Sequence, residues 1–69
     1  MEAQLNDRQK RIVLQVLKEG AVTSGWCTRQ FEVVYDTANR DLKGLIELQV
    51  LQRQGRGRAV RYVLKERKP

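Results

Sequence analysis

The sequence lacks most of what catalytic and metal sites need. It has no histidine and only one cysteine, Cys27, so one chain can form neither a disulfide framework nor a zinc site of Cys and His. No nucleophile stands beside a base, and there is no phosphate-binding glycine loop or carboxylate cluster. We therefore expect a protein that is not an enzyme and that holds no metal and no cofactor. Cys27 is predicted to be a small core residue in a reducing, intracellular compartment.

Long apolar runs are also missing. No stretch approaches the roughly 20 apolar residues needed to span a bilayer, and the N-terminus lacks the charged-then-apolar pattern of a signal peptide. The sequence contains no repeat, linker or low-complexity segment. Its 69 residues leave room for one domain with a modest core. We expect a single cytoplasmic domain over residues 1–69, with a flexible basic tail at residues 65–69 and no membrane contact.

What the sequence does have is an uneven distribution of charge. The net charge is +6 at pH 7. Residues 1–49 carry seven basic and seven acidic side chains, whereas residues 50–69 carry seven basic side chains and only Glu66. A positive field concentrated in this way attracts a polyanion, and nucleic acid is the commonest one inside cells. The alternative, at least for residues 65–68, is a basic tail that only increases solubility.

The first helix is expected at residues 7–19. Asn6 followed by Gln9 three residues later is typical of a capping box, and Gly20 is suited to end the helix. All but one of residues 12–17 are apolar. Because this apolar arc is wider than the stripe of a surface helix, we expect the first helix to be packed on two sides.

Two further helices are predicted at residues 25–31, capped by Ser24, and at residues 35–48. The connection of about three residues between them is typical of a helix-turn-helix. In the third helix, four apolar side chains recur on one face: Ala38, Leu42, Leu45 and Ile46.

A β-hairpin is predicted from residues 50–54 and 59–64, which flank the glycine-arginine turn at residues 55–58. Residues 21–23 are long enough only for an edge strand. The predicted order is α-β-α-α-β-β, an α+β domain of three helices and a small antiparallel sheet. This is the order of a winged helix-turn-helix domain.

Four segments resemble DeoR-type winged helix domains: residues 5–10 (LNDRQK), 20–23 (GAVT), 37–42 (TANRDL) and 57–64 (GRAVRYVL). Similar domains lie at the C-termini of Fic-family proteins and of bacterial regulators with ATPase-like or helicase-like N-terminal regions. The resemblance implies a nucleoid-associated domain that binds double-stranded DNA in transcription regulation. Such a domain works alone, as a homodimer or fused to a larger regulator.

Two departures from this family concern the third helix. Such domains usually have Gly-Val-Ser before this helix, whereas this chain has Glu32, Val33 and Val34. They usually have a glycine after the helix, whereas this chain has Gln49 and Val50. Each departure is expected to lower the local stability of the fold by about 1 kcal/mol. The topology is unaffected, but the angle of the third helix stays open.

The resemblance implies that the third helix, about residues 35–48, enters the major groove of DNA. Helical periodicity predicts an outward face made of Asp36, Thr37, Arg40, Lys43, Gly44 and Glu47. Thr37, Arg40 and Lys43 are the predicted DNA contacts, because arginine can read guanine and threonine can touch a thymine methyl group or a phosphate. For Arg40 the alternative is an ion pair with Asp36 or Glu47.

The sequence also allows a separate prediction for each of four other residues. Asp41 is predicted to orient a neighbouring basic group, and Tyr35 to pack on the core side. Gly44 either allows close backbone approach or is merely tolerated. Trp26 either packs on the first helix or makes an exposed aromatic contact with a partner.

The arginine wing, residues 53–61, supplies the other predicted DNA contacts: Arg53, Arg56, Arg58 and Arg61. A slim cationic turn can lie along phosphates or enter a narrow minor groove, and a merely solvated turn is the alternative. Because the third helix carries a net charge of −1, affinity is expected to depend on the wing. Specificity would then be low or supplied by dimerisation.

A second function also fits the sequence. The apolar arc of the helix at residues 7–19 and Trp26 could form a protein-interaction or dimerisation surface, as part of a larger helicase-like, ATPase-like or Fic protein. A module of that kind would show no salt-dependent DNA binding.

Overall fold

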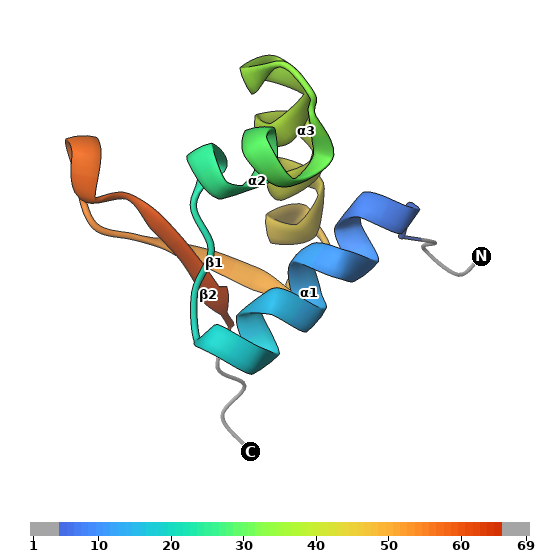
Figure 1. Cartoon of the computed structure of the whole chain (residues 1–69). Helices are drawn as coiled ribbons and strands as arrows, with labels where there is room; N and C mark the ends of the chain where they lie inside the picture. The colour runs from blue at the N-terminus through green and yellow to red at the C-terminus, as the bar shows by residue number, and fades with distance from the viewer. Residues whose placement is uncertain (1–4, 66–69) are drawn as a thin grey trace.

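Three helices followed by a two-stranded hairpin make up residues 5–65, the part of the chain that the computed structural model describes (Figure 1). The helices are α1 (Asp7–Glu19), α2 (Ser24–Phe31) and α3 (Tyr35–Glu47). The strands are β1 (Leu51–Gln54) and β2 (Arg61–Leu64), separated by a short 3-10 turn, η1 (Gly57–Ala59). This α+β architecture is winged-helix-like. Of the tail expected at residues 65–69, residues 66–69 lie outside the described residues.

The early strand expected at residues 21–23 does not form. Only Val22 pairs with β2, through N–H···O bonds in both directions with Tyr62, of 2.9 and 2.8 Å. Gly20 closes α1 and Thr23 caps α2, so little chain is left between the two caps. The predicted order is therefore corrected to α-α-α-β-β, with Val22 as an isolated bridge.

The capping box that starts α1 is confirmed. The Asn6 side chain accepts a hydrogen bond from the Gln9 N–H (2.7 Å), and the Gln9 side chain accepts one from the Asn6 N–H (3.0 Å). Gly20 ends the helix with φ of 93°, in the left-handed region that favours glycine.

The prediction that α1 is packed on two sides is wrong. Ile12 and Val16 are buried, but Leu14 and Leu17 are 63% and 61% exposed. The main contacts of α1 are with α3 and β2. Because Leu14 and Leu17 stay exposed beside these contacts, part of the apolar arc faces solvent.

The helix-turn-helix is present, with different caps from those expected. Thr23, not Ser24, caps α2: its Oγ1 accepts a hydrogen bond from the Trp26 N–H (3.1 Å). At the end of α2, Glu32 adopts φ of 53°, a left-handed conformation that costs a non-glycine residue about 1 kcal/mol. Val34 precedes α3 without a capping hydrogen bond from its side chain. The missing glycine and serine thus leave the topology intact.

The hairpin has two distinct faces. In the antiparallel register, Leu51 pairs with Leu64 and Arg53 with Tyr62. Directly opposed residues share a face and neighbours along a strand alternate. One face therefore carries Leu51, Arg53, Tyr62 and Leu64, and the other carries Gln52, Gln54, Arg61 and Val63. Leu51 and Tyr62 are buried, whereas Leu64 on the same face is exposed.

One hydrophobic core joins all the elements. It contains Ile12, Val16, Val22, Cys27, Ala38, Leu42, Leu45, Leu51 and Tyr62. The predicted inward face of α3 is confirmed, with Ile46 half-buried at its edge. Cys27 is a core residue, as expected. Burial, together with the nearby negative charge of Asp41, raises the pKa of its thiol to about 11, so it stays protonated at neutral pH.

Candidate nucleic-acid interface

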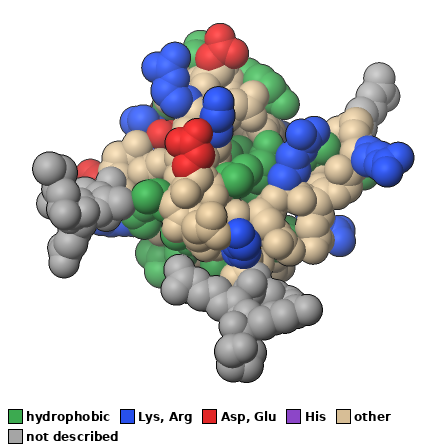
Figure 2. All heavy atoms as spheres, turned by 180° about the vertical axis from the view of Figure 1, so that it is seen from behind, with side chains coloured by type: hydrophobic (Ala, Val, Ile, Leu, Met, Phe, Trp, Pro, Cys, Tyr) green, Lys and Arg blue, Asp and Glu red, His purple; other side chains and the backbone are tan. Residues whose placement is uncertain are grey.

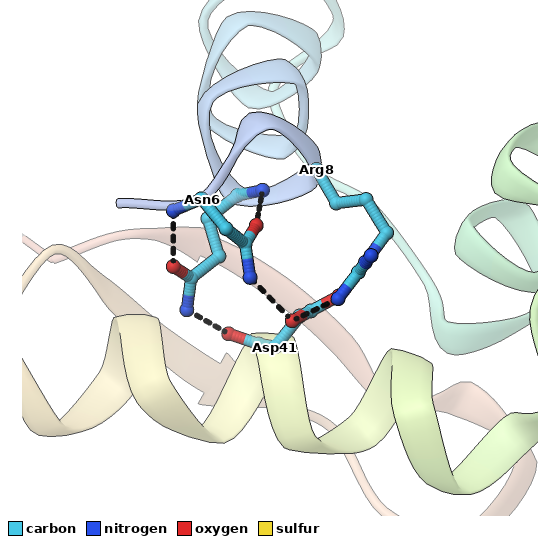
Figure 3. Close-up of polar contacts among 4 residues, drawn as sticks. Asn6, Arg8 and Asp41 are labelled. Atoms are coloured by element: carbon cyan, nitrogen blue, oxygen red, sulfur yellow. Dashed lines mark hydrogen bonds and ion pairs between the residues drawn. The ribbon is translucent and has the colours of Figure 1, made fainter. Parts of the chain in front are cut away.

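A buried carboxylate fixes α3 to α1 (Figure 3). Asp41 is only 5% exposed, and it accepts hydrogen bonds from Arg8 (Nε to Oδ2, 2.6 Å) and Asn6 (Nδ2 to Oδ1, 3.0 Å). Burial works to raise the pKa of Asp41, but the hydrogen bonds from Arg8 and Asn6 and the charge of Arg8 outweigh it and lower the pKa. The prediction that Asp41 orients a basic group is confirmed, and that group is Arg8.

Gly44 belongs to the same contact, one turn further along α3. The Gln9 side chain donates a hydrogen bond from Nε2 to the Asp41 carbonyl oxygen (3.1 Å). A Cβ atom at Gly44 would lie 2.7 Å from that nitrogen. The prediction that Gly44 lies on the outward face is therefore wrong. A side chain there would displace the end of the Gln9 side chain from the Asp41 carbonyl oxygen.

A second polar contact holds the other flank of α3. Ser24, buried at the start of α2, donates a hydrogen bond from Oγ to Oδ1 of Asn39 (2.8 Å). At 100° per residue, Asn39 and Asp41 point to nearly opposite flanks of the helix. The two contacts together set the angle of α3 that the sequence left open.

A groove of about 430 Å³ lies between the helix-turn-helix and the hairpin. Its lining comes from the start of α2, from α3 and from the hairpin: Thr23, Ser24, Gly25, Tyr35, Asn39, Arg53, Gly57, Val60 and Tyr62. The expectation that Tyr35 packs on the core side is wrong, because it is 59% exposed. Neither Tyr35 nor Asn39 is among the predicted site residues. Their spacing of four residues, which places both on one flank of α3, was the available signal.

The outward side of α3 carries exposed charges of both signs: Asp36, Arg40, Lys43 and Glu47. Thr37 is half-buried at its edge. Among the side chains that the structure describes, the only ion pair joins Arg8 to Asp41, so the alternative pairing of Arg40 with Asp36 or Glu47 is not formed. Because Asp41 is paired within the fold, the charges left on the outward side cancel.

The hairpin separates the predicted arginines. Arg53 shares a face with Tyr62 and lines the groove, whereas Arg61 lies on the opposite face. Arg56 is exposed at the tip, and the side chain of Arg58 lies outside the part that the structure describes. Arg53, Arg56 and Arg61 have no acidic partner within 4.0 Å among the described residues.

The charge pattern is visible on the side of the molecule turned away from the viewer of Figure 1. Figure 2 shows basic and acidic side chains together over the helices, but only basic ones over the hairpin. Within residues 5–65, every acidic residue precedes β1 in the chain: Asp7, Glu19, Glu32, Asp36, Asp41 and Glu47. The hairpin therefore carries several basic side chains and, among the described residues, no acidic one.

These features define a winged-helix-like domain, with a helix-turn-helix and a cationic hairpin on either side of a groove. The sequence matches no protein-family model and no curated protein. The structure supports a winged-helix-like fold, and the DeoR-type resemblance stays a prediction. In the described part of the chain, no helix is both long and apolar enough to cross a bilayer. The same residues contain no group of three or more His, Cys, Asp or Glu side chains that could hold a metal ion.

Proposed function

We propose that this domain binds double-stranded DNA with α3 and the hairpin, as the DNA-binding part of a DeoR-type transcriptional regulator. One observation carries the proposal: exposed arginines without acidic partners project from the hairpin beside a groove that follows α3. Such cations keep their full attraction for phosphate, because no neighbouring carboxylate neutralises them.

The main part of the affinity is assigned to the hairpin. Arg53 reaches the phosphates of the strand that passes through the groove, and Arg56 reaches the backbone or the minor groove beyond the tip. Arg61 faces away from the groove and adds only to the long-range field. This ranking revises the sequence-based set, which treated all wing arginines alike.

The contribution of α3 is positioning and modest sequence preference. Arg40 and Lys43 are free of ion pairs and can meet phosphates or guanine edges in the major groove. Asp36 and Glu47 on the same side repel phosphate, so tight reading by this helix alone is not expected. Higher specificity would come from a second copy of the domain or from a larger protein that carries it.

The test is a titration of fluorescently labelled random duplex DNA at several salt concentrations between about 50 and about 200 mM. Log K should fall linearly with log salt, with a slope of about −0.9 for each phosphate contact. The double variant Arg53→Ala/Arg56→Ala should make this slope less steep by about 1.8.

The matched control removes a cation elsewhere. Lys10→Ala deletes an exposed charge from α1 and should leave the slope unchanged. Absence of binding at low salt, or a double variant that behaves like Lys10→Ala, would rule out the proposal.

A further inference from the structure

A second hollow surface is lined by residues of α1 and α2, away from the groove. Two adjoining hollows of about 310 and 340 Å³ share Arg11 and Gln30. We call this surface the α1–α2 seam; it is lined mainly by Arg11, Leu14, Lys18, Trp26, Gln30 and Phe31. None of these residues lines the groove beside the hairpin.

The floor of the seam is apolar. Trp26 and Phe31 form an edge-to-face pair with ring centroids 5.6 Å apart, and both are only partly buried. Leu14 stands beside Trp26 with most of its side chain exposed. Large apolar side chains left accessible together in a hollow are typical of protein-binding sites.

The rim of the seam is cationic. Arg11 and Lys18 lie one turn on either side of Leu14 along α1, and neither has an ion-pair partner among residues 5–65. The hollow around Leu14 and Trp26 has no acidic residue in its lining. Asp7 is the one acid in the lining of the seam, at its far end. A complementary ligand is therefore apolar in the middle and acidic along its edge.

The shape of the seam favours a helix as the ligand. From Asp7 to Lys18 the seam follows about 16 Å of α1, which equals about three turns of a bound helix. A concave, elongated site suits the insertion of side chains at i, i+4 and i+7, as in other helix-in-groove contacts. A flat membrane surface would not fill it.

We propose that the α1–α2 seam binds an amphipathic helix of a partner protein. The apolar side chains of that helix pack on Leu14 and Trp26, and its acidic side chains face Arg11 and Lys18. This proposal is independent of DNA binding, because the two ligands use different side chains.

The experiment uses the fluorescence of Trp26, the only tryptophan in the chain. The probe is a synthetic helical peptide of about 14 residues with leucines at i, i+4 and i+7 and glutamates on both flanks. The acidic peptide should shift the Trp26 emission in a saturable way. A matched peptide with lysine in place of every glutamate should bind at least about tenfold more weakly.

Two leucine variants sharpen the test, since both positions are exposed and should not affect folding. Leu14→Ala removes a residue of the seam and should weaken peptide binding about tenfold. Leu17→Ala removes an equally exposed leucine of α1 outside the seam and should stay within about twofold of the original chain. DNA binding should be unchanged in both variants.

Three results would overturn the proposal. The first is no Trp26 response to the acidic peptide at millimolar concentration, and the second is an equal loss in Leu14→Ala and Leu17→Ala. The third is a response to phosphatidylserine vesicles or to duplex DNA without a response to the peptide. Because the DNA titration uses Arg53 and Arg56, its outcome is distinguishable from these.

Discussion

Two arginines show how the same side chain serves different purposes in two regions of this domain. Arg8 is paired with the buried Asp41 at 2.6 Å and holds α1 against α3. Arg53 lines the groove without an acidic partner among the described residues. The paired guanidinium uses its hydrogen bonds within the fold and sets the geometry of α3, whereas the unpaired one is available to a ligand. A binding surface is therefore located by which charges are paired, and net charge alone does not show this.

The largest expected effect follows from removing Asp41, the buried partner of Arg8. Asp41→Ala should lower the free energy of unfolding by about 2–3 kcal/mol, because it removes a buried acceptor and leaves Asn6 without its partner on α3. Urea denaturation measures the loss. Asp36→Ala, the matched control, removes an exposed aspartate of the same helix and should cost no more than about 0.5 kcal/mol. Equal costs would mean that the contact of α1 with α3 does not depend on Asp41.

The next effect concerns the turn that presents the unpaired arginines. Gly55 has φ of 88°, and a Cβ atom there would lie 2.3 Å from the Ala59 carbonyl oxygen. Gly57 has φ of 56° but open space around it. Gly55→Ala should therefore cost about 2 kcal/mol and weaken DNA binding, whereas Gly57→Ala should cost about 1 kcal/mol. Thermal unfolding of the two variants compares them. A larger loss for Gly57→Ala would show that the turn does not depend on the close approach of Gly55 to Ala59.

A smaller effect separates the two faces of the hairpin. Arg53→Ala should weaken DNA binding about tenfold at low salt, and Arg61→Ala about twofold, because only Arg53 lines the groove. The slope of log K against log salt should change by about 0.9 for Arg53→Ala alone. Identical slopes for the two variants would show that DNA reaches both faces of the hairpin.

Local features of the fold could be predicted from the sequence. The capping box of Asn6 and Gln9 spans three residues, and the inward face of α3 follows from the spacing of Ala38, Leu42 and Leu45. Both depend on interactions within one element, for which helical periodicity is a sufficient guide. The hairpin was predicted from its two β-prone runs and the glycines between them, but β2 begins at Arg61 and not at residue 59, because Gly57–Ala59 form a 3-10 turn.

Contacts between elements could not be predicted in the same way. The contact of Gly44 with Gln9 joins residues far apart in the sequence, and the exposure of Leu14 depends on which neighbours cover α1. Periodicity shows which side of a helix faces the core of the domain, but it does not show which flank faces the hairpin. Tyr35 and Asn39 were missed as groove residues for this reason.

The smallest expected effect is on the pH dependence of stability, which tests the contact between Arg8 and Asp41. Because the pKa of Asp41 is lowered in the folded chain, its contribution to stability is fully present above the ordinary aspartate value of 3.8. That contribution is lost as the pH falls below this value through the lower pKa of the folded state.

Asp41→Asn keeps the size of the side chain and removes the titrating group. Its urea midpoint should change less between about pH 5 and about pH 3 than that of the original chain. Asp36→Asn, which removes an exposed carboxylate from the same helix, should retain the original pH dependence. If Asp41→Asn instead follows the original curve, the acid sensitivity arises elsewhere. In that case, the pairing of Arg8 with Asp41 would not explain how stability depends on pH.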